Sequence, residues 1–171
     1  IEQQLIDGQI DMAVHSMKDM PSTPAKGLVF TKSWKREDPR DVLILRTASN
    51  LSDLRKGAVI GTGSKRRAFQ LLKQRPDLKI VNIRGNVDTR LRKMEEQELD
   101  GIILAAAGLK RLGMQDVITQ YLEPEEMISA PAQGVLALEV REDQKELQQM
   151  LDVFSDEETM NEVCAERNFL E

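Results

Sequence analysis

The stretch that decides the fold runs from residue 58 to residue 113, and its first loop reads Val59-Ile60-Gly61-Thr62-Gly63-Ser64-Lys65-Arg66-Arg67. Apolar runs of strand length alternate in this stretch with amphipathic runs of helix length. The pattern predicts three successive pairs: strand 58–61 with helix 65–75, strand 79–84 with helix 89–98, and strand 101–106 with helix 107–113. Such alternation is typical of an α/β fold with right-handed crossovers and a largely parallel sheet.

Shorter elements are expected on both sides of this series. Before it, the pattern predicts the end of a helix at residues 1–7, stopped by Gly8, and strands at 11–15, 28–31 and 41–45. After it, apolar residues at 136, 138 and 140 alternate with their neighbours, which predicts a half-buried strand. The remaining residues look helical, and Ser155 with Glu158 predicts a capping box at the start of the final helix.

Composition excludes several classes of protein. The chain has 171 residues, a net charge of −5 and one cysteine. An acidic chain argues against broad binding to nucleic acids or anionic membranes, and no apolar run approaches the roughly 20 residues of a membrane span. A single cysteine rules out internal disulfides and fits a reducing compartment, so we expect a cytoplasmic protein. Because the chain begins at Ile1, inside a helical pattern, we expect it to be a fragment of a longer protein.

Arginines follow each of the three predicted strands. Two follow the first strand, two the second and one the third: Arg66, Arg67, Arg84, Arg90 and Arg111. In a parallel sheet, the carboxyl ends of the strands meet at one edge, where ligands bind. Guanidinium groups and helix N-termini both suit carboxylates and phosphates. We therefore expect a pocket for a ligand with several negative groups, although any single arginine could instead be solvated or paired with a surface acid.

A second candidate constellation is His15-Ser16-Met17-Lys18-Asp19, in a turn after a predicted strand. An aspartate in such a turn usually forms the turn or caps a helix. His15 is the only histidine, so a histidine triad or a multi-histidine metal site is hard to assemble, and no metal is expected. Ser64 is interpreted as a helix cap, and Cys164 as a buried thiol within a helix.

The string Asp11-Met12-Ala13-Val14-His15-Ser16-Met17-Lys18-Asp19-Met20-Pro21 resembles the signature of the porphobilinogen deaminase family, also called hydroxymethylbilane synthase. Further matches follow in the same order at residues 36–41, 61–67, 84–90, 107–113 and 133–134. The resemblance covers nearly the whole chain. It implies α/β domains like those of type II periplasmic binding proteins, with largely parallel sheets.

The resemblance also implies a division into domains. Residues 1–34 and 135–152 would form a partial first domain, 40–128 a complete second domain, and 156–171 the start of a third. The segments 35–39 and 129–134 would act as a hinge between the first two domains.

What the resemblance implies about function is a transferase of tetrapyrrole (porphyrin and heme) biosynthesis. Such an enzyme joins four porphobilinogen molecules into hydroxymethylbilane with loss of ammonia, starting from a dipyrromethane cofactor held by a cysteine. By motif position, Asp19 would be the catalytic carboxylate, stabilising the azafulvene cation formed when ammonia leaves. The cofactor-binding residues would be Lys18, Ser64, Arg66, Arg67, Arg84 and Arg90. The substrate-binding residues would be Ser16, Arg84, Arg90, Arg111 and Gln133.

The chain departs from the family pattern at the cofactor attachment. Cys164 precedes the stretch 165–170 and lacks flanking glycines, so we expect it to carry no dipyrromethane and the fragment alone to be inactive. Family members are usually monomeric, whereas self-association of the fragment stays open. The competing class is a non-catalytic anion-binding module, such as a solute receptor, on the same architecture. The turn carrying Lys18 and Asp19 favours the enzyme, because a passive receptor for polycarboxylates gains nothing from a buried carboxylate.

Overall fold

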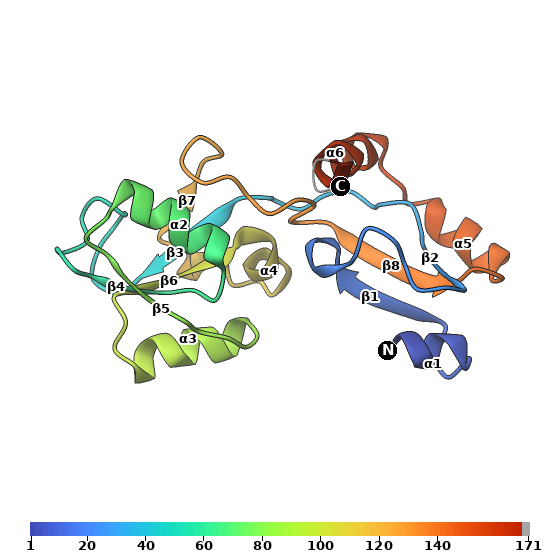
Figure 1. The fold of residues 1–171 in the computed structure, drawn as a ribbon, viewed down its shortest axis with the longest axis horizontal. Helices are drawn as coiled ribbons and strands as arrows, with labels where there is room; N and C mark the ends of the chain where they lie inside the picture. The colour runs from blue at the N-terminus through green and yellow to red at the C-terminus, as the bar shows by residue number, and fades with distance from the viewer. Residues whose placement is uncertain (169–171) are drawn as a thin grey trace. The chain divides into compact units, whose positions relative to one another are not determined.

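The structure is a computed structural model that describes residues 1–168, and the chain divides into two compact units (Figure 1). Unit 1 contains Ile1–Pro39 and Ala130–Glu171, and unit 2 contains Arg40–Ser129. Each unit has its own sheet and its own apolar clusters. Within the described residues, no helix is long and apolar enough to cross a membrane.

Unit 2 is built on a five-stranded sheet in the order β5-β4-β6-β3-β7. The strands are β3 (Asp41–Leu45), β4 (Val59–Gly61), β5 (Lys79–Val81), β6 (Gly101–Ala105) and β7 (Gln120–Leu122). Strand β4 pairs in parallel with β5 and with β6, as expected for strands joined by helical crossovers. Strand β3 instead runs antiparallel to both β6 and β7. The start of β3 therefore lies beside the carboxyl end of β6, with Asp41 opposite Ala105.

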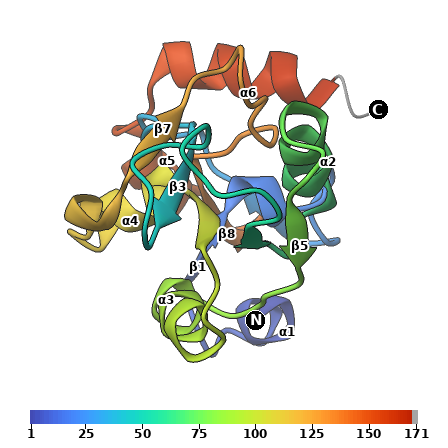
Figure 2. The ribbon, with the colours of Figure 1, turned by 90° about the vertical axis from the view of Figure 1, so that its left-hand side faces the viewer.

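Helices cover both faces of the unit 2 sheet. They are α2 (Lys65–Gln74), α3 (Val87–Glu96) and α4 (Ala106–Arg111), followed by a 3₁₀ turn, η2 (Gln115–Val117). Figures 1 and 2 show α2 and α3 on opposite sides of the strands. Alternate residues of β3 point to the two sides: Leu43 packs in one cluster with Leu71 of α2, and Val42 in the other with Met94 of α3. This two-sided burial explains why β3 and β6 read as continuous apolar runs.

The first turn of each long helix in unit 2 is fixed by a side-chain cap. Ser64 Oγ accepts a hydrogen bond from the Arg67 amide at 3.4 Å, which confirms the predicted cap of α2. Asn86 Oδ1 accepts from the Thr89 amide at 2.9 Å. Because of this cap, α3 begins two residues earlier than the predicted helix 89–98.

Unit 1 is built on a three-stranded sheet in the order β1-β8-β2. Its strands are β1 (Met12–Ser16), β2 (Leu28–Phe30) and β8 (Leu136–Arg141). Both β1 and β2 pair antiparallel with the central strand β8. Its helical elements are α1 (Glu2–Ile6), the 3₁₀ turn η1 (Met17–Asp19), α5 (Lys145–Asp152) and α6 (Glu157–Asn168).

Two local predictions for unit 1 were wrong. Strand β8 is not half-buried: Ala137 and Glu139, on the face expected to be open, are 1% and 0% exposed. Both faces of the strand are covered, since Ala137 packs with Val163 of α6 and Leu138 with Leu151 of α5. The cap of α6 is not Ser155. Asp156 Oδ1 accepts from the Thr159 amide at 2.9 Å, which places the cap one residue later.

The chain leaves unit 1 after Pro39 and returns at Ala130, and the two crossing segments bind each other inside unit 1. The Glu37 amide donates to the Gly134 carbonyl at 3.1 Å. Gly134 has a φ of +91°, and a Cβ there would lie 2.2 Å from the Glu37 carbonyl oxygen. Only glycine permits this close approach of two backbones.

Candidate functional site

The Lys18–Asp19 turn of unit 1 projects from the end of strand β1. It forms the 3₁₀ turn η1, whose start is fixed by a hydrogen bond from the Met17 amide to the Val135 carbonyl at 3.0 Å. Asp19 is exposed, so the expectation of a buried carboxylate was wrong. The turn directly follows the last residue of β1 and lies outside the described strands of the sheet. Within residues 1–168, no hydrogen bond or ion pair engages the Asp19 carboxylate, which leaves its oxygens available to a ligand.

Gln133 holds the neighbouring lysine in place. Lys18 Nζ donates to Gln133 Oε1 at 3.2 Å, and Gln133 Nε2 donates to the Pro39 carbonyl at 2.6 Å. Gln133 is fully buried. The Pro39 carbonyl therefore orients the Gln133 amide, and the amide oxygen in turn positions the Lys18 ammonium group.

The remaining polar residues of this segment differ in exposure. Ser16 is exposed at the last position of β1, opposite Leu136. His15 Nε2 lies 3.0 Å from Glu139 Oε2, and Glu139 is fully buried. The only histidine is thus engaged by an acid of the central strand.

In unit 2, the second member of the Arg66–Arg67 pair is an internal group. Arg67 Nη2 lies 2.7 Å from Asp41 Oδ1, and Arg67 Nη1 donates to the Ile103 carbonyl at 3.2 Å. The side chain of Arg67 is 6% exposed and that of Asp41 is 0% exposed. The sequence analysis expected Arg67 to bind a carboxylate of the cofactor. In the structure, its guanidinium instead pairs with the buried carboxylate of Asp41.

Arg66 pairs with the same carboxylate and is more exposed than Arg67. Its Nη1 is 2.7 Å from Asp41 Oδ2, it also donates to the Ile128 carbonyl, and its side chain is 25% exposed. Burial alone would raise the pKa of Asp41, but the charges and hydrogen bonds of Arg67 and Arg66 outweigh burial and hold that pKa below its ordinary value. Asp41 therefore stays ionised and anchors both arginines.

The loops after β4 and β5 lie against each other. A Cβ added at Gly63 would lie 2.8 Å from the Ile83 carbonyl oxygen and 3.7 Å from Cγ of Arg84. Arg84 is exposed, and within the described part of the chain no side-chain hydrogen bond or ion pair engages its guanidinium. Arg90 is half-buried, and its Nε donates to the Gly85 carbonyl at 2.7 Å.

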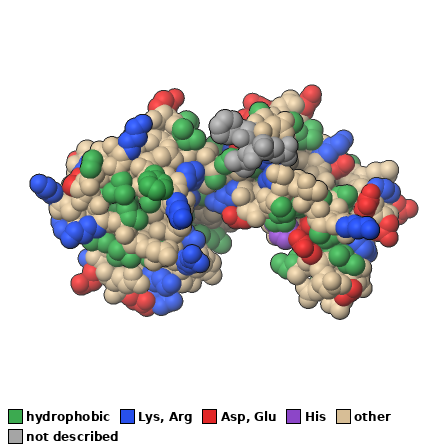
Figure 3. Space-filling view, in the orientation of Figure 1, with side chains coloured by type: hydrophobic (Ala, Val, Ile, Leu, Met, Phe, Trp, Pro, Cys, Tyr) green, Lys and Arg blue, Asp and Glu red, His purple; other side chains and the backbone are tan. Residues whose placement is uncertain are grey.

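The structure thus brings together most of the predicted arginines of unit 2. The positive charge of Arg90 is close enough to contribute to lowering the pKa of Arg67, after the larger effect of burial. Arg111 is exposed at the C-terminal end of α4, which is 6 residues long and begins directly after β6. Figure 3 shows Lys and Arg side chains spread over the visible face of unit 2.

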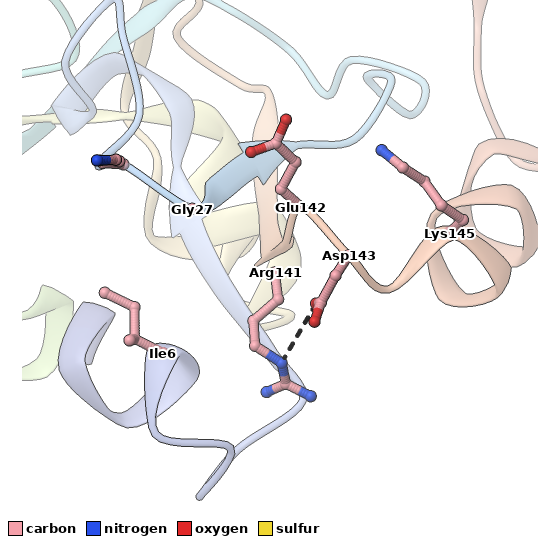
Figure 4. A pocket seen from close by; sticks show the side chains of 7 residues that line it. Ile6, Gly27, Arg141, Glu142, Asp143 and Lys145 are labelled. Atoms are coloured by element: carbon pink, nitrogen blue, oxygen red, sulfur yellow. Dashed lines mark ion pairs between the residues drawn. The ribbon is translucent and has the colours of Figure 1, made fainter.

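A separate hollow of about 440 Å³ lies in unit 1 (Figure 4). Its lining includes Ile6, Gly27, Arg141 and Lys145, and none of the predicted site residues. Arg141 Nη1 already donates to the Leu5 and Ile10 carbonyls, at 2.8 and 3.2 Å. This guanidinium therefore serves to join α1 to the sheet.

The structure changes the interpretation of two residues, Asp41 and Cys164. Asp41 was missed as part of the site, although an acid at the head of an otherwise apolar run is a signal that a buried cation is near. Cys164 is exposed, so its predicted burial was wrong. Helix α6 buries Thr159 and Val163, which are four residues apart, and this places position 164 on another face.

The fold defines the class of protein. A putative methionine-binding lipoprotein from Bacillus subtilis has a TM-score of 0.59 at 12% identity, and the match covers 92% of this chain and 75% of that one. A probable amino-acid ABC transporter extracellular-binding protein, also from Bacillus subtilis, has a TM-score of 0.54 at 16% identity, covering 94% and 72%. At these identities the likeness concerns the fold alone: an α/β fold of the type II periplasmic-binding-protein kind.

Sequence comparison then gives the family. The model described as porphobilinogen deaminase, dipyromethane cofactor binding domain, matches residues 1–149. Porphobilinogen deaminases from Clostridioides difficile and Lachnospira eligens are 58% and 59% identical over 100% and 99% of this chain. The chain belongs to the porphobilinogen deaminase family. It spans 57% and 58% of the length of these two relatives.

Proposed function

We propose that the protein acts as a hydroxymethylbilane synthase, joining four porphobilinogen molecules into hydroxymethylbilane with loss of ammonia. The observation that carries this proposal is the match of the cofactor-binding-domain model to residues 1–149. That range contains both the Lys18–Asp19 turn and the arginine loops of unit 2. We also propose porphobilinogen as the partner and the cytoplasm as the location, on the biosynthetic role of the family.

The cations of unit 2 suit the carboxylates of the substrate. Each porphobilinogen carries an acetate and a propionate, so a growing chain is a polyanion. Arg84 is exposed and Arg66 is partly exposed, so both can donate paired hydrogen bonds to carboxylate oxygens. Arg90 and Arg111 add positive charge. Arg67 acts indirectly, since its ion pair with Asp41 anchors the first turn of α2, which also carries Arg66.

Asp19 is the group proposed to act on the reacting atoms. Its exposed carboxylate can accept a hydrogen bond from a pyrrole N–H and stabilise the cation left when ammonia departs from porphobilinogen. Lys18, held by the buried Gln133, places a second charge beside it for a substrate carboxylate, and Ser16 adds an exposed hydroxyl.

The residues present also suit the carboxylates of a dipyrromethane. In unit 2, Arg66, Arg84, Arg90 and the Ser64 end of α2 would hold them. In unit 1, Lys18 offers a cation of the same kind. When bound, the group supplies the free pyrrole end from which the chain grows. Cys164 does not fit the attachment point, because it lies within α6 with its thiol beside Asn168, at 3.5 Å.

Steady-state kinetics of three variants would test the proposal, in a protein of full family length that carries this sequence. Asp19→Asn keeps the shape and removes the charge, so kcat should fall by about 10²–10³-fold with little change in KM. Arg84→Leu removes a charge-assisted contact of roughly 1.5–3 kcal/mol, so kcat/KM should fall by roughly 10–100-fold through KM. Arg92→Leu is the control, because Arg92 lies on α3 in an exposed pair with Glu96.

Near-normal turnover in Asp19→Asn would remove Asp19 from the mechanism. Binding of porphobilinogen by the unaltered protein without any release of ammonia would support the alternative, a non-catalytic anion-binding module.

A further inference from the structure

The guanidinium of Arg167, in α6, forms hydrogen bonds with the residues on both sides of Lys18 and Asp19. Arg167 Nη1 donates to the Met17 carbonyl at 2.9 Å, and Arg167 Nη2 donates to the Met20 carbonyl at 3.0 Å. Met17 and Met20 are the residues on either side of Lys18 and Asp19. One planar fork therefore spans the turn that carries both charged groups.

The fork complements the other contacts of the turn. The residue just before strand β8 fixes the start, because the Met17 amide donates to the Val135 carbonyl. Inside the turn, the Met20 amide donates to the Met17 carbonyl at 3.1 Å. Beyond Met20 the chain enters a loop, so the contact from Arg167 fixes the end of the turn. A guanidinium suits this task because its two terminal nitrogens, Nη1 and Nη2, are held at a fixed spacing, whereas a lysine side chain has a single nitrogen.

Helix α6 is itself firmly attached to unit 1. Arg36 Nη1 lies 2.9 Å from Glu162 and 2.6 Å from Glu166, and Glu166 also accepts a hydrogen bond from the Ala132 amide at 2.6 Å. Val163 packs in the same buried cluster as Met17. Because the helix is held by both charge and packing, Arg167 is a fixed point rather than a mobile side chain.

We propose that Arg167 is a positioning residue for catalysis: it sets the conformation of the Lys18–Asp19 turn, and thereby the placement of the Asp19 carboxylate, without touching substrate itself. This proposal rests on the proposed function, in which Asp19 stabilises the reacting cation. A displacement of about 1 Å at such a group costs on the order of 10²-fold in rate.

Kinetics of Arg167→Ala and Arg167→Lys, in a protein of full family length, would test the role in turnover. We expect kcat to fall by about 10²-fold in Arg167→Ala with a smaller change in KM, and by less in Arg167→Lys, which can reach one of the two carbonyls. Arg92→Ala should leave kcat unchanged. In an Asp19→Asn background, Arg167→Ala should add no further loss, since both changes remove the same contribution.

Hydrogen exchange on the 171-residue chain gives a readout that does not depend on activity. The Met20 amide should exchange faster in Arg167→Ala than in the unaltered chain or in Arg92→Ala, while amides of β6 stay unchanged. Should Arg167→Ala fail to fold, Arg167→Lys carries both measurements.

The outcomes separate the two proposals. Faster exchange of the Met20 amide in Arg167→Ala, together with normal turnover in Asp19→Asn, would show that Arg167 holds the turn and would remove Asp19 from the mechanism. Unchanged exchange at Met20 overturns the positioning role. A full 10²-fold loss added on top of Asp19→Asn also overturns it, because Arg167 would then act by a route that does not pass through Asp19.

Discussion

Asp41→Asn should destabilise unit 2 more than any surface substitution, because it leaves a buried guanidinium without a counter-charge. The asparagine keeps the shape of the carboxylate and removes its charge. The side chain of Arg67 is only 6% exposed, so water cannot replace the lost partner. Breaking a buried pair in this way costs about 3–5 kcal/mol. An exposed pair such as Arg92–Glu96, with side chains 61% and 52% exposed, contributes less than about 1 kcal/mol.

Urea denaturation of the chain, followed by circular dichroism, would measure the difference. The free energy of unfolding should fall by roughly 3–5 kcal/mol in Asp41→Asn and by less than about 1 kcal/mol in the control Arg92→Ala. The double variant Asp41→Asn with Arg67→Met should recover part of the loss, because no unpaired charge then stays buried at Arg67. If Asp41→Asn is as stable as Arg92→Ala, the reasoning from burial is refuted.

The same pair makes stability depend on pH. The pKa of Asp41 is lowered in the folded chain from its ordinary value of 3.8. A lowered pKa means that the contribution is present above the unfolded value and is lost as the pH falls through the folded value. The unaltered chain should therefore lose stability more steeply than Asp41→Asn as the pH falls below about 4.

Three further outcomes follow from local geometry. Asp156→Ala should lower the melting temperature by a few degrees and Ser155→Ala should not, since only Asp156 caps α6. Gly134→Ala should cost at least roughly 1–3 kcal/mol in urea denaturation, and more than Gly27→Ala, because both positions have positive φ but only Gly134 meets a backbone oxygen. Cys164 should react with a thiol reagent in the folded chain at close to the rate seen in urea, and strong protection would contradict its exposure.

Sequence patterns predicted the framework of unit 2 well. The strand predicted at 41–45 has those bounds, and that at 101–106 is one residue shorter, because buried strands keep continuous apolar runs. The same patterns failed for β8, where Glu139 read as a solvent-facing residue. It is buried because His15, more than a hundred residues away in the chain, supplies its partner. Periodicity records the polarity of a side chain and carries no information about a distant partner.

The sequence likewise predicted one part of the candidate site and could not predict another. The strand–loop–helix order placed Arg66, Arg84 and Arg90 near the carboxyl edge of one sheet, and the structure brings their loops together. The order of strands in the sheet could not be read from the pattern. It is the antiparallel insertion of β3 that delivers Asp41 to this edge and turns Arg67 inward. Which arginine faces a ligand thus depends on strand order, which local sequence does not encode.

The central place of β8 in unit 1 has a consequence for how the chain is made. Strands β1 and β2 emerge from the ribosome early, yet both pair with β8, which is synthesised after all the strands of unit 2. During that interval unit 2 can close its own sheet, while β1 and β2 lack β8 as a partner. The pairing of β1 and β2 with β8 therefore depends on translation reaching residue 141, and a product that stops before β8 would carry a folded unit 2 while β1 and β2 lack this partner strand.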